Sequence, residues 1–195
     1  MRHKVQTFLT ESEIKDILRQ PDRRTFLGKR DFAILLLMLS TGIRRNELCS
    51  LNRDDLKVEG KKVWLYVWGK GGRQRRIPVK DLELLECLKE FVALTNPRNI
   101  PDKPLFVSES KQGGLGIRRV TWKMVRWLVE KYARQAKIPK KIHPHSLRHT
   151  FITHALRKSG DLPAVQKLAG HSDIKTTQIY LHTDEDRMEK VISSL

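Results

Sequence analysis

The chain has 195 residues, and its 39 Lys and Arg residues against 22 Asp and Glu residues give a formal net charge of +17. Hydrophobic residues make up 39% of the chain, enough to bury a core, so a wholly disordered chain is excluded. The longest apolar run, 32–39, is far shorter than the roughly 20 residues that span a bilayer, and no signal-peptide core follows the N-terminus. We therefore expect no membrane association. Cys49 and Cys87 lack disulfide or metal spacing, so we expect them to be core thiols of a protein in a reducing, cytoplasmic setting.

The basic residues are concentrated in two regions. Residues 111–158 contain 13 Lys and Arg residues and one acidic residue, Glu130, which is a net +12 in 48 residues. A second cluster without any acid consists of Lys70, Arg73, Arg75, Arg76 and Lys80. Because like charges at this density repel each other in a compact fold, we expect a polyanionic partner, most simply nucleic acid phosphate. A surface that serves only solubility is the alternative.

The first half of the chain is predicted to contain three helices and a β-hairpin. Thr10 and Glu13 have the spacing of a capping box at the start of the first helix, and Gly42 is placed to end the second. Aromatic and β-branched residues on both sides of a glycine-rich turn predict the hairpin. The expected helices are 10–18, 29–40 and 44–50, and the expected strands are 62–68 and 76–79.

The second half is predicted to be helical in shorter pieces. Thr121 is a helix cap, Pro144 favours a helix start, and Gly160 and Gly170 follow apolar patterns that they would end. The expected helices are 81–95, 121–136, 146–158, 162–169 and 172–182, with a short strand at 105–107. The fold class is therefore mainly α with a small antiparallel β-sheet (α+β), and the chain is expected to form a single domain over residues 1–195.

Two segments place arginine and histidine at predicted helix starts. Arg44 follows the glycine that ends one helix and begins the next, where nearby backbone N–H groups also favour a phosphate. Further along, His145 and Arg148 are three residues apart and share one helical face. Both arrangements suit a site that binds phosphate and moves a proton. A third segment has His171 after a glycine helix end and Tyr180 nine residues later, although such a tyrosine is often only a core residue.

A cluster of histidines also raises the possibility of a metal site. His143, His145, His149 and His154 lie close in sequence, but no cysteine or acidic residue stands at a matching ligand spacing. We therefore expect no metal and no other cofactor.

Taken in order, these segments resemble the tyrosine recombinase family, which includes phage integrases and Xer-like proteins, and they resemble its C-terminal catalytic domain in particular. The six positions that match the family's catalytic pattern are Arg44, Lys70, His145, Arg148, His171 and Tyr180. Supporting matches are Glu47, three residues after the first arginine, and His149, directly after the second. The resemblance covers the chain from about Thr10 to its C-terminus.

The resemblance implies a site-specific recombinase that cleaves and rejoins DNA through a 3′-phosphotyrosyl link, without metal or ATP. Tyr180 would attack the scissile phosphate and His145 would accept its proton, since a tyrosine pKa of about 10 is too high for spontaneous ionisation. Arg44 and Arg148 would stabilise charge on the non-bridging oxygens. The resemblance implies that His171 donates a further hydrogen bond to these oxygens. It also implies that Lys70 protonates the leaving 5′-oxygen.

Two other functions remain open at this point. A type IB topoisomerase uses the same chemistry but rejoins the same strand. A non-catalytic DNA-binding regulator would account for the basic surface, but it gives no reason for the six matching positions to occur together.

DNA and further copies of the chain are the expected partners. Residues expected to contact DNA are Arg73, Arg75, Lys123 and Arg126. Only about ten residues precede the first predicted helix, so we expect the chain to lack the family's usual N-terminal core-binding domain, either as a fragment or as a natural minimal member. Weak and salt-sensitive binding to double-stranded DNA is then expected. A homo-oligomer, dimer to tetramer, is expected on DNA and a monomer without it, in the cytoplasm and associated with the nucleoid. The apolar stripe of residues 184–195 would dock on a neighbouring protomer or, alternatively, on its own core.

Overall fold

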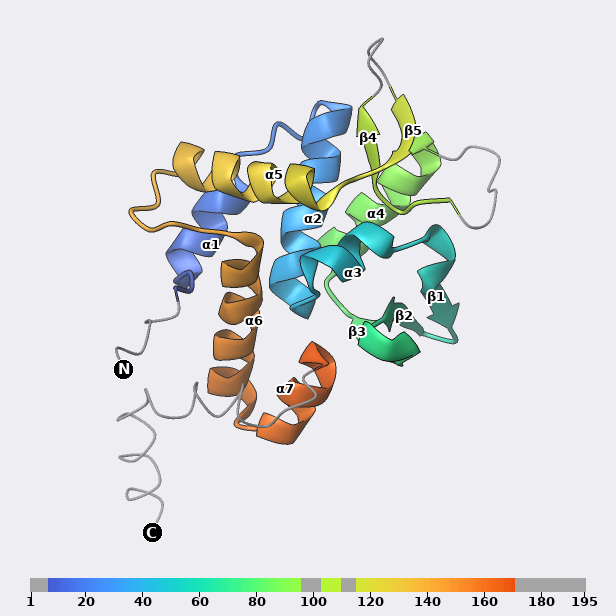
Figure 1. Ribbon diagram of the computed structural model, residues 1–195, viewed down its shortest axis with the longest axis vertical. Helices are drawn as coiled ribbons and strands as arrows, with labels where there is room; N and C mark the ends of the chain where they lie inside the picture. Colours follow the sequence, from blue (N-terminus) through green and yellow to red (C-terminus); the bar gives the residue numbers. More distant parts are fainter. Residues whose placement is uncertain (1–6, 96–102, 110–114, 171–195) are drawn as a thin grey trace.

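The computed structural model describes residues 7–95, 103–109 and 115–170, and a central helix organises it (Figure 1). This helix, α2 (Phe26–Thr41), packs against α1, α3, α4, α5 and α6. Buried residues lie on all sides of it, as its run of apolar residues without a polar stripe predicts. Helix α2 begins three residues before the predicted start because Thr25 caps it by accepting a hydrogen bond from the Gly28 N–H.

The other helices follow the local signals of the sequence. Within the described residues they are α1 (Glu11–Leu18), α3 (Arg45–Ser50), α4 (Leu82–Thr95), α5 (Trp122–Gln135), α6 (Pro144–Ser159) and α7 (Leu162–Ala169), with the short 3-10 helices η1 (Arg53–Asp55) and η2 (Lys70–Gly72). Thr10 and Glu13 form the predicted capping box, and Thr121 caps α5. The predicted helix 172–182 and the tail 184–195 lie outside the described residues.

In the described residues, two small antiparallel sheets flank the helices (Figure 1). The three-stranded sheet has the order β1 (Leu56–Glu59), β2 (Lys62–Trp68) and β3 (Gln74–Val79), and the two-stranded sheet pairs β4 (Val107–Glu109) with β5 (Leu115–Arg119). In the β2–β3 hairpin Leu65 lies opposite Ile77, and both side chains face the core. The predicted hairpin is therefore confirmed.

Two strands were not predicted and a third lies elsewhere. Three of the four residues of β1 are exposed, so it has no buried face to produce an alternating pattern, and Gly116 weakens the strand signal of β5. The strand predicted at 105–107 lies at Val107–Glu109 instead. Leu105 and Phe106 are apolar because they fill the core, not because they pair in a sheet.

The C-terminal end of α2 packs closely on α6. Gly42 ends α2 in the left-handed conformation, with φ of 63°, and a Cβ atom at this residue would come within 2.3 Å of the Phe151 ring. Glycine thus allows both the helix end and the close approach of α6. This contact fixes where the segment that follows α2 meets α6.

A buried charge network connects α2 with α5 and β4. Arg30 and Asp31 are 5% and 3% exposed, and the Arg30 Nη2–H donates to the Asp31 carboxylate at 2.7 Å. The Tyr132 hydroxyl donates to the same carboxylate at 2.9 Å, and Arg30 also donates to the Val107 carbonyl. Both charges are therefore paired and hydrogen-bonded, as burial requires.

The cysteines and the helix lengths agree with the composition. Cys87 is buried, Cys49 is half-buried and both are free thiols; burial raises the pKa of Cys49 to about 11, so it is protonated at neutral pH. None of the helices in the described ranges is long and apolar enough to cross a membrane.

Replacement of Asp31 by alanine is predicted to destabilise the fold strongly. The variant would leave the Arg30 guanidinium charged and buried without its carboxylate, which costs about 3–5 kcal/mol. Urea unfolding measures the change in the free energy of unfolding. The control is Asp16→Ala, which removes an exposed ion pair with Arg19 and should cost less than about 1 kcal/mol. Equal losses in the two variants would contradict the assigned role of the buried network.

Candidate active site

A pocket of about 500 Å³ lies where α3, α5 and the start of α6 meet. Its lining is predominantly basic and consists of Ile43, Arg44, Arg45, Asn46, Arg126, His143, Pro144, His145 and Arg148. Three of the predicted catalytic residues, Arg44, His145 and Arg148, are among them. Arg44 is about one hundred residues from the other two in the sequence, and the packing of α2 on α6 brings them together.

Arg44 is held by its own helix and by α7. It is the N-cap residue of α3, its backbone N–H donates to Glu47 Oε2 at 2.9 Å, and its Nη1–H donates to Glu47 Oε1 at 2.9 Å. Its Nη2–H donates to the Gly170 carbonyl at 2.8 Å. The side chain remains 42% exposed, so the guanidinium is anchored at one side and open to the pocket at the other.

Arg148 is held more tightly than Arg44. It is only 2% exposed, and its two terminal nitrogens donate to the Gly42 carbonyl at 2.6 Å and the Ala169 carbonyl at 2.8 Å. Burial, and then the charge of Arg44, lower its pKa to about 10. The guanidinium is therefore still charged at neutral pH.

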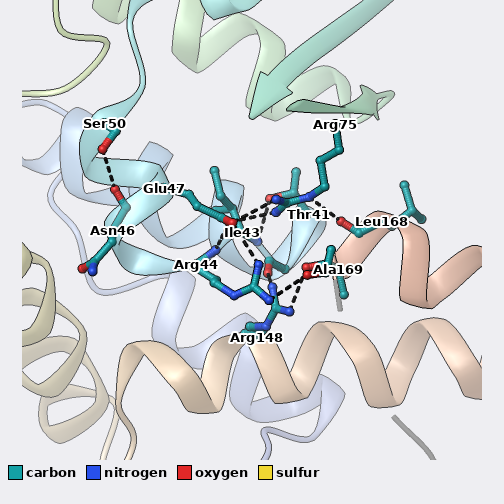
Figure 2. A network of polar contacts seen from close by, with 12 residues as sticks. Thr41, Ile43, Arg44, Asn46, Glu47, Ser50, Arg75, Arg148, Leu168 and Ala169 are labelled. Atoms are coloured by element: carbon teal, nitrogen blue, oxygen red, sulfur yellow. Dashed lines mark hydrogen bonds and ion pairs between the residues drawn. The ribbon is translucent and has the colours of Figure 1, made fainter. Parts of the chain in front are cut away.

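Glu47 links two arginines of different elements (Figure 2). Arg75 of β3 donates from Nη1 to Oε1 at 2.9 Å and from Nη2 to Oε2 at 2.8 Å, and Arg44 donates to the same carboxylate. Burial opposes ionisation of Glu47, but the hydrogen bonds from Arg75 and Arg44 outweigh it and hold its pKa below the ordinary value. Glu47 is thus ionised and paired.

The position of Arg75 differs from the expectation that it contacts DNA. Its side chain is 13% exposed, and its guanidinium is turned inward onto Glu47 and the Leu168 carbonyl. The sequence showed a basic hairpin but not that the alternating pleat of β3 turns Arg75 inward between two exposed neighbours, Gln74 and Arg76. Arg73, by contrast, is exposed as expected.

His145 lines the pocket and lies on the first turn of α6. Partial burial, followed by the positive charges of Arg148, Arg44 and Arg45, lowers its pKa below the ordinary value. The ring is therefore neutral at pH 7, as a proton acceptor must be. The buried His149 ring meets it edge to face, with 4.3 Å between ring centroids.

The remaining predicted site residues are placed in part. The backbone of Lys70 opens η2 at the tip of the hairpin, and Lys123 and Arg126 lie on α5, where Arg126 lines the pocket and pairs with Glu130. His171 and Tyr180 lie outside the described residues. In the described part of the chain, no group of three His, Cys, Asp or Glu side chains is arranged to hold a metal ion.

The structure adds Arg45 to the pocket, which the sequence analysis did not single out. Its guanidinium lies 4.8 Å from the centre of the Trp122 ring, and Trp122 is 44% exposed at the start of α5. Arg45 was not recognised from the sequence because it directly follows Arg44, and a second arginine at a helix start is ordinarily a solvated side chain. The pair extends the basic pocket toward the exposed face of α5.

Comparison with known proteins gives a consistent family. A profile described as the phage integrase family matches residues 7–187. Tyrosine recombinase XerC of Thermodesulfovibrio yellowstonii is 39% identical over 183 residues, 91% of this chain and 58% of that protein, and XerC of Pseudomonas fluorescens (strain ATCC BAA-477) is 44% identical over 87% and 53% of the two chains. The chain thus spans between half and three fifths of the length of these relatives.

Solved structures agree with this result. The crystal structure of XerH site-specific recombinase bound to palindromic difH substrate, a post-cleavage complex, superposes with a TM-score of 0.81 and 26% identity over 97% of this chain and 53% of that chain. The structure of XerA recombinase gives a TM-score of 0.78 and 27% identity over 98% and 66%. The fold is therefore the one found in these recombinases.

The charge on Glu47 is predicted to make stability depend on pH. Because the folded-state pKa is lowered, the carboxylate stabilises the fold above the ordinary glutamate pKa, and this contribution is lost as the pH falls through the folded-state value. Glu47→Gln should therefore be less stable than wild type at pH 7 by about 3 kcal/mol. Urea unfolding between pH 7 and 3 should show the difference shrinking with acid. Glu83→Gln, at an exposed pair with Arg23, serves as the control, and a difference independent of pH would contradict the prediction.

Proposed function

Because the chain belongs to the phage integrase family, we propose that it is the catalytic part of a site-specific DNA recombinase that cleaves and rejoins strands through a 3′-phosphotyrosyl intermediate. The observation that carries the proposal is that Arg44, His145 and Arg148, from distant parts of the sequence, line one basic pocket. The XerC relatives and the DNA-bound XerH structure support double-stranded DNA as the substrate.

The two pocket arginines would bind the scissile phosphate. A guanidinium can donate parallel hydrogen bonds to two oxygens and keeps its charge, which suits a phosphate whose negative charge grows in the transition state. Hydrogen bonds to backbone carbonyls hold Arg44 and Arg148 in place before DNA binds. Little reorganisation is then needed when the substrate arrives.

Tyr180 would be the nucleophile and His145 its base. The Tyr180 hydroxyl oxygen bonds to phosphorus, its proton passes to the neutral His145 ring, and the bond from phosphorus to the 5′-oxygen breaks. Lys70 donates a proton to that leaving oxygen, and His171 donates a hydrogen bond to a non-bridging oxygen. The low pKa of His145 supports its role, because a protonated ring could not accept the tyrosine proton.

Rejoining would be the same reaction in reverse with another strand. A 5′-hydroxyl attacks the phosphotyrosine, which retains the energy of the broken bond, so neither ATP nor a metal ion is required. The arginines supply the positive charge that a metal would otherwise provide. Exchange of strands between two duplexes requires several copies, and we propose a dimer to tetramer on DNA in the nucleoid, with residues 184–195 docking on a neighbouring protomer.

Covalent attachment to DNA tests this function without knowledge of the target site. The protein is incubated with supercoiled plasmid in EDTA at low salt and stopped with SDS. Wild type should relax the plasmid and form a protein–DNA adduct, and Tyr180→Phe should do neither, because it lacks the nucleophilic oxygen. Activity in both proteins would show that Tyr180 is not the nucleophile. Loss of wild-type activity in EDTA with recovery in magnesium would refute the metal-independent mechanism.

The role of His145 predicts a pH dependence. Adduct formation at limiting protein should fall as the pH is lowered, with a midpoint below the ordinary histidine value of about 6.5, because the free enzyme's base is protonated there. The measurement is the initial rate of adduct formation between pH 5 and 8. His145→Ala should be slow throughout and lack this inflection. A midpoint above 6.5, or an unchanged inflection in His145→Ala, would exclude His145 as the base.

A further inference from the structure

Arg75 of the hairpin is fully paired within the protein. Its guanidinium donates to both oxygens of Glu47 and, through Nε, to the Leu168 carbonyl at 3.0 Å. Each of its three nitrogens therefore has a partner, and the side chain is only 13% exposed. A guanidinium in this state has little to offer a DNA phosphate, so the role of Arg75 lies in what it holds together within the protein.

Arg75 belongs to a set of three arginines at the C-terminal end of α7 (Figure 2). The Leu168, Ala169 and Gly170 carbonyls are consecutive, and they accept hydrogen bonds from Arg75, Arg148 and Arg44, respectively. The last carbonyls of a helix lack partners within the helix and carry its partial negative charge, so guanidinium groups bind there favourably. The end of α7 thereby sets the relative positions of three side chains from β3, α6 and the start of α3.

The backbone at Gly170 is shaped to the Arg75 side chain. Gly170 has φ of 66°, and a Cβ atom there would lie 2.9 Å from Arg75 Nη1 and 3.0 Å from Cζ. Glycine thus permits the helix end and also leaves room for the guanidinium.

We propose that Arg75 is a positioning residue for strand cleavage, an inference that rests on the proposed function. Arg75 lies five residues after Lys70 in the hairpin, and it holds that hairpin against the end of α7, from which the chain continues directly to His171. Through Glu47 it also fixes Arg44. Arg75 therefore fixes the positions of the hairpin, Arg44 and the end of α7 relative to one another. It does this from within the protein and not by contacting DNA.

The forked shape of arginine is essential to this role. A lysine could keep the charge opposite Glu47, but it has a single nitrogen and could not bind both carboxylate oxygens and the Leu168 carbonyl in fixed directions. Misplacement of a reacting group by about 1 Å can reduce a rate 10²-fold. Arg75→Lys is therefore the informative substitution, since it leaves the net charge unchanged.

The test separates the cleavage rate from DNA binding. With supercoiled plasmid, the single-turnover rate of adduct formation at saturating protein should fall about 10²-fold in Arg75→Lys, while the half-saturating protein concentration and its salt dependence stay at wild-type values. The matched control is Arg73→Ala, which removes an exposed hairpin cation. It should bind more weakly with a shallower salt slope and, once bound, cleave at the wild-type rate.

A second variant covers the case in which Arg75→Lys folds poorly. Gly170→Ala leaves every charge in place but presses on the guanidinium and strains the left-handed turn, so it should also slow cleavage. Its effect should be smaller in an Arg75→Lys background, where the contact is already lost and only the backbone strain remains. Wild-type cleavage rates in Arg75→Lys, a loss of DNA binding like that of Arg73→Ala, or additive effects would overturn the positioning role. A wild-type protein that forms no adduct would instead refute the proposed function.

Discussion

The hydrogen bonding of arginines to the last carbonyls of α7 is the interaction on which the rest of the site depends. Arg44, Arg75 and Arg148 come from different elements, and without a common acceptor three guanidinium groups would repel one another. The helix end gives them adjacent, fixed partners. Glu47 reduces the repulsion further and binds two of the three. Like charges can therefore be assembled beside the pocket without a bound anion.

Helix α2 connects the buried core to the three arginines at the end of α7. Near its start, Arg30 and Asp31 are buried in a network with Tyr132, and at its end the Gly42 carbonyl accepts a hydrogen bond from Arg148. The intervening turns are covered by other helices. A shift of α2 along its axis would therefore break polar contacts at both ends. Arg148 is therefore anchored to the end of a helix that is fixed in the close-packed core.

Much of the fold and part of the site could be predicted, because their signals are local. Caps such as Thr10 and Gly42 mark helix ends in a few residues, and the spacing of His145 and Arg148 fixes a shared face. The strand β1 could not be predicted, since its pairing with β2 is not encoded by an alternating pattern of its own. The predicted strand begins at residue 76, so Arg75 is not recognised as part of its inward face. The partners that Arg75 binds there lie 28 and 93 residues away, and no local pattern specifies them.

The net charge of the arginine network depends on whether each arginine is bound by a carbonyl or by a carboxylate. Peptide carbonyls are neutral, so binding them leaves a guanidinium with its full charge, whereas the Glu47 carboxylate cancels one of the three. Two positive charges are left in the network, on groups that border the pocket. A pentacoordinate phosphorane formed from a phosphodiester carries two negative charges. The ground-state diester carries one. Under the proposed function, the charge of the network would therefore complement the transition state better than the substrate, which is the condition for catalysis rather than mere binding.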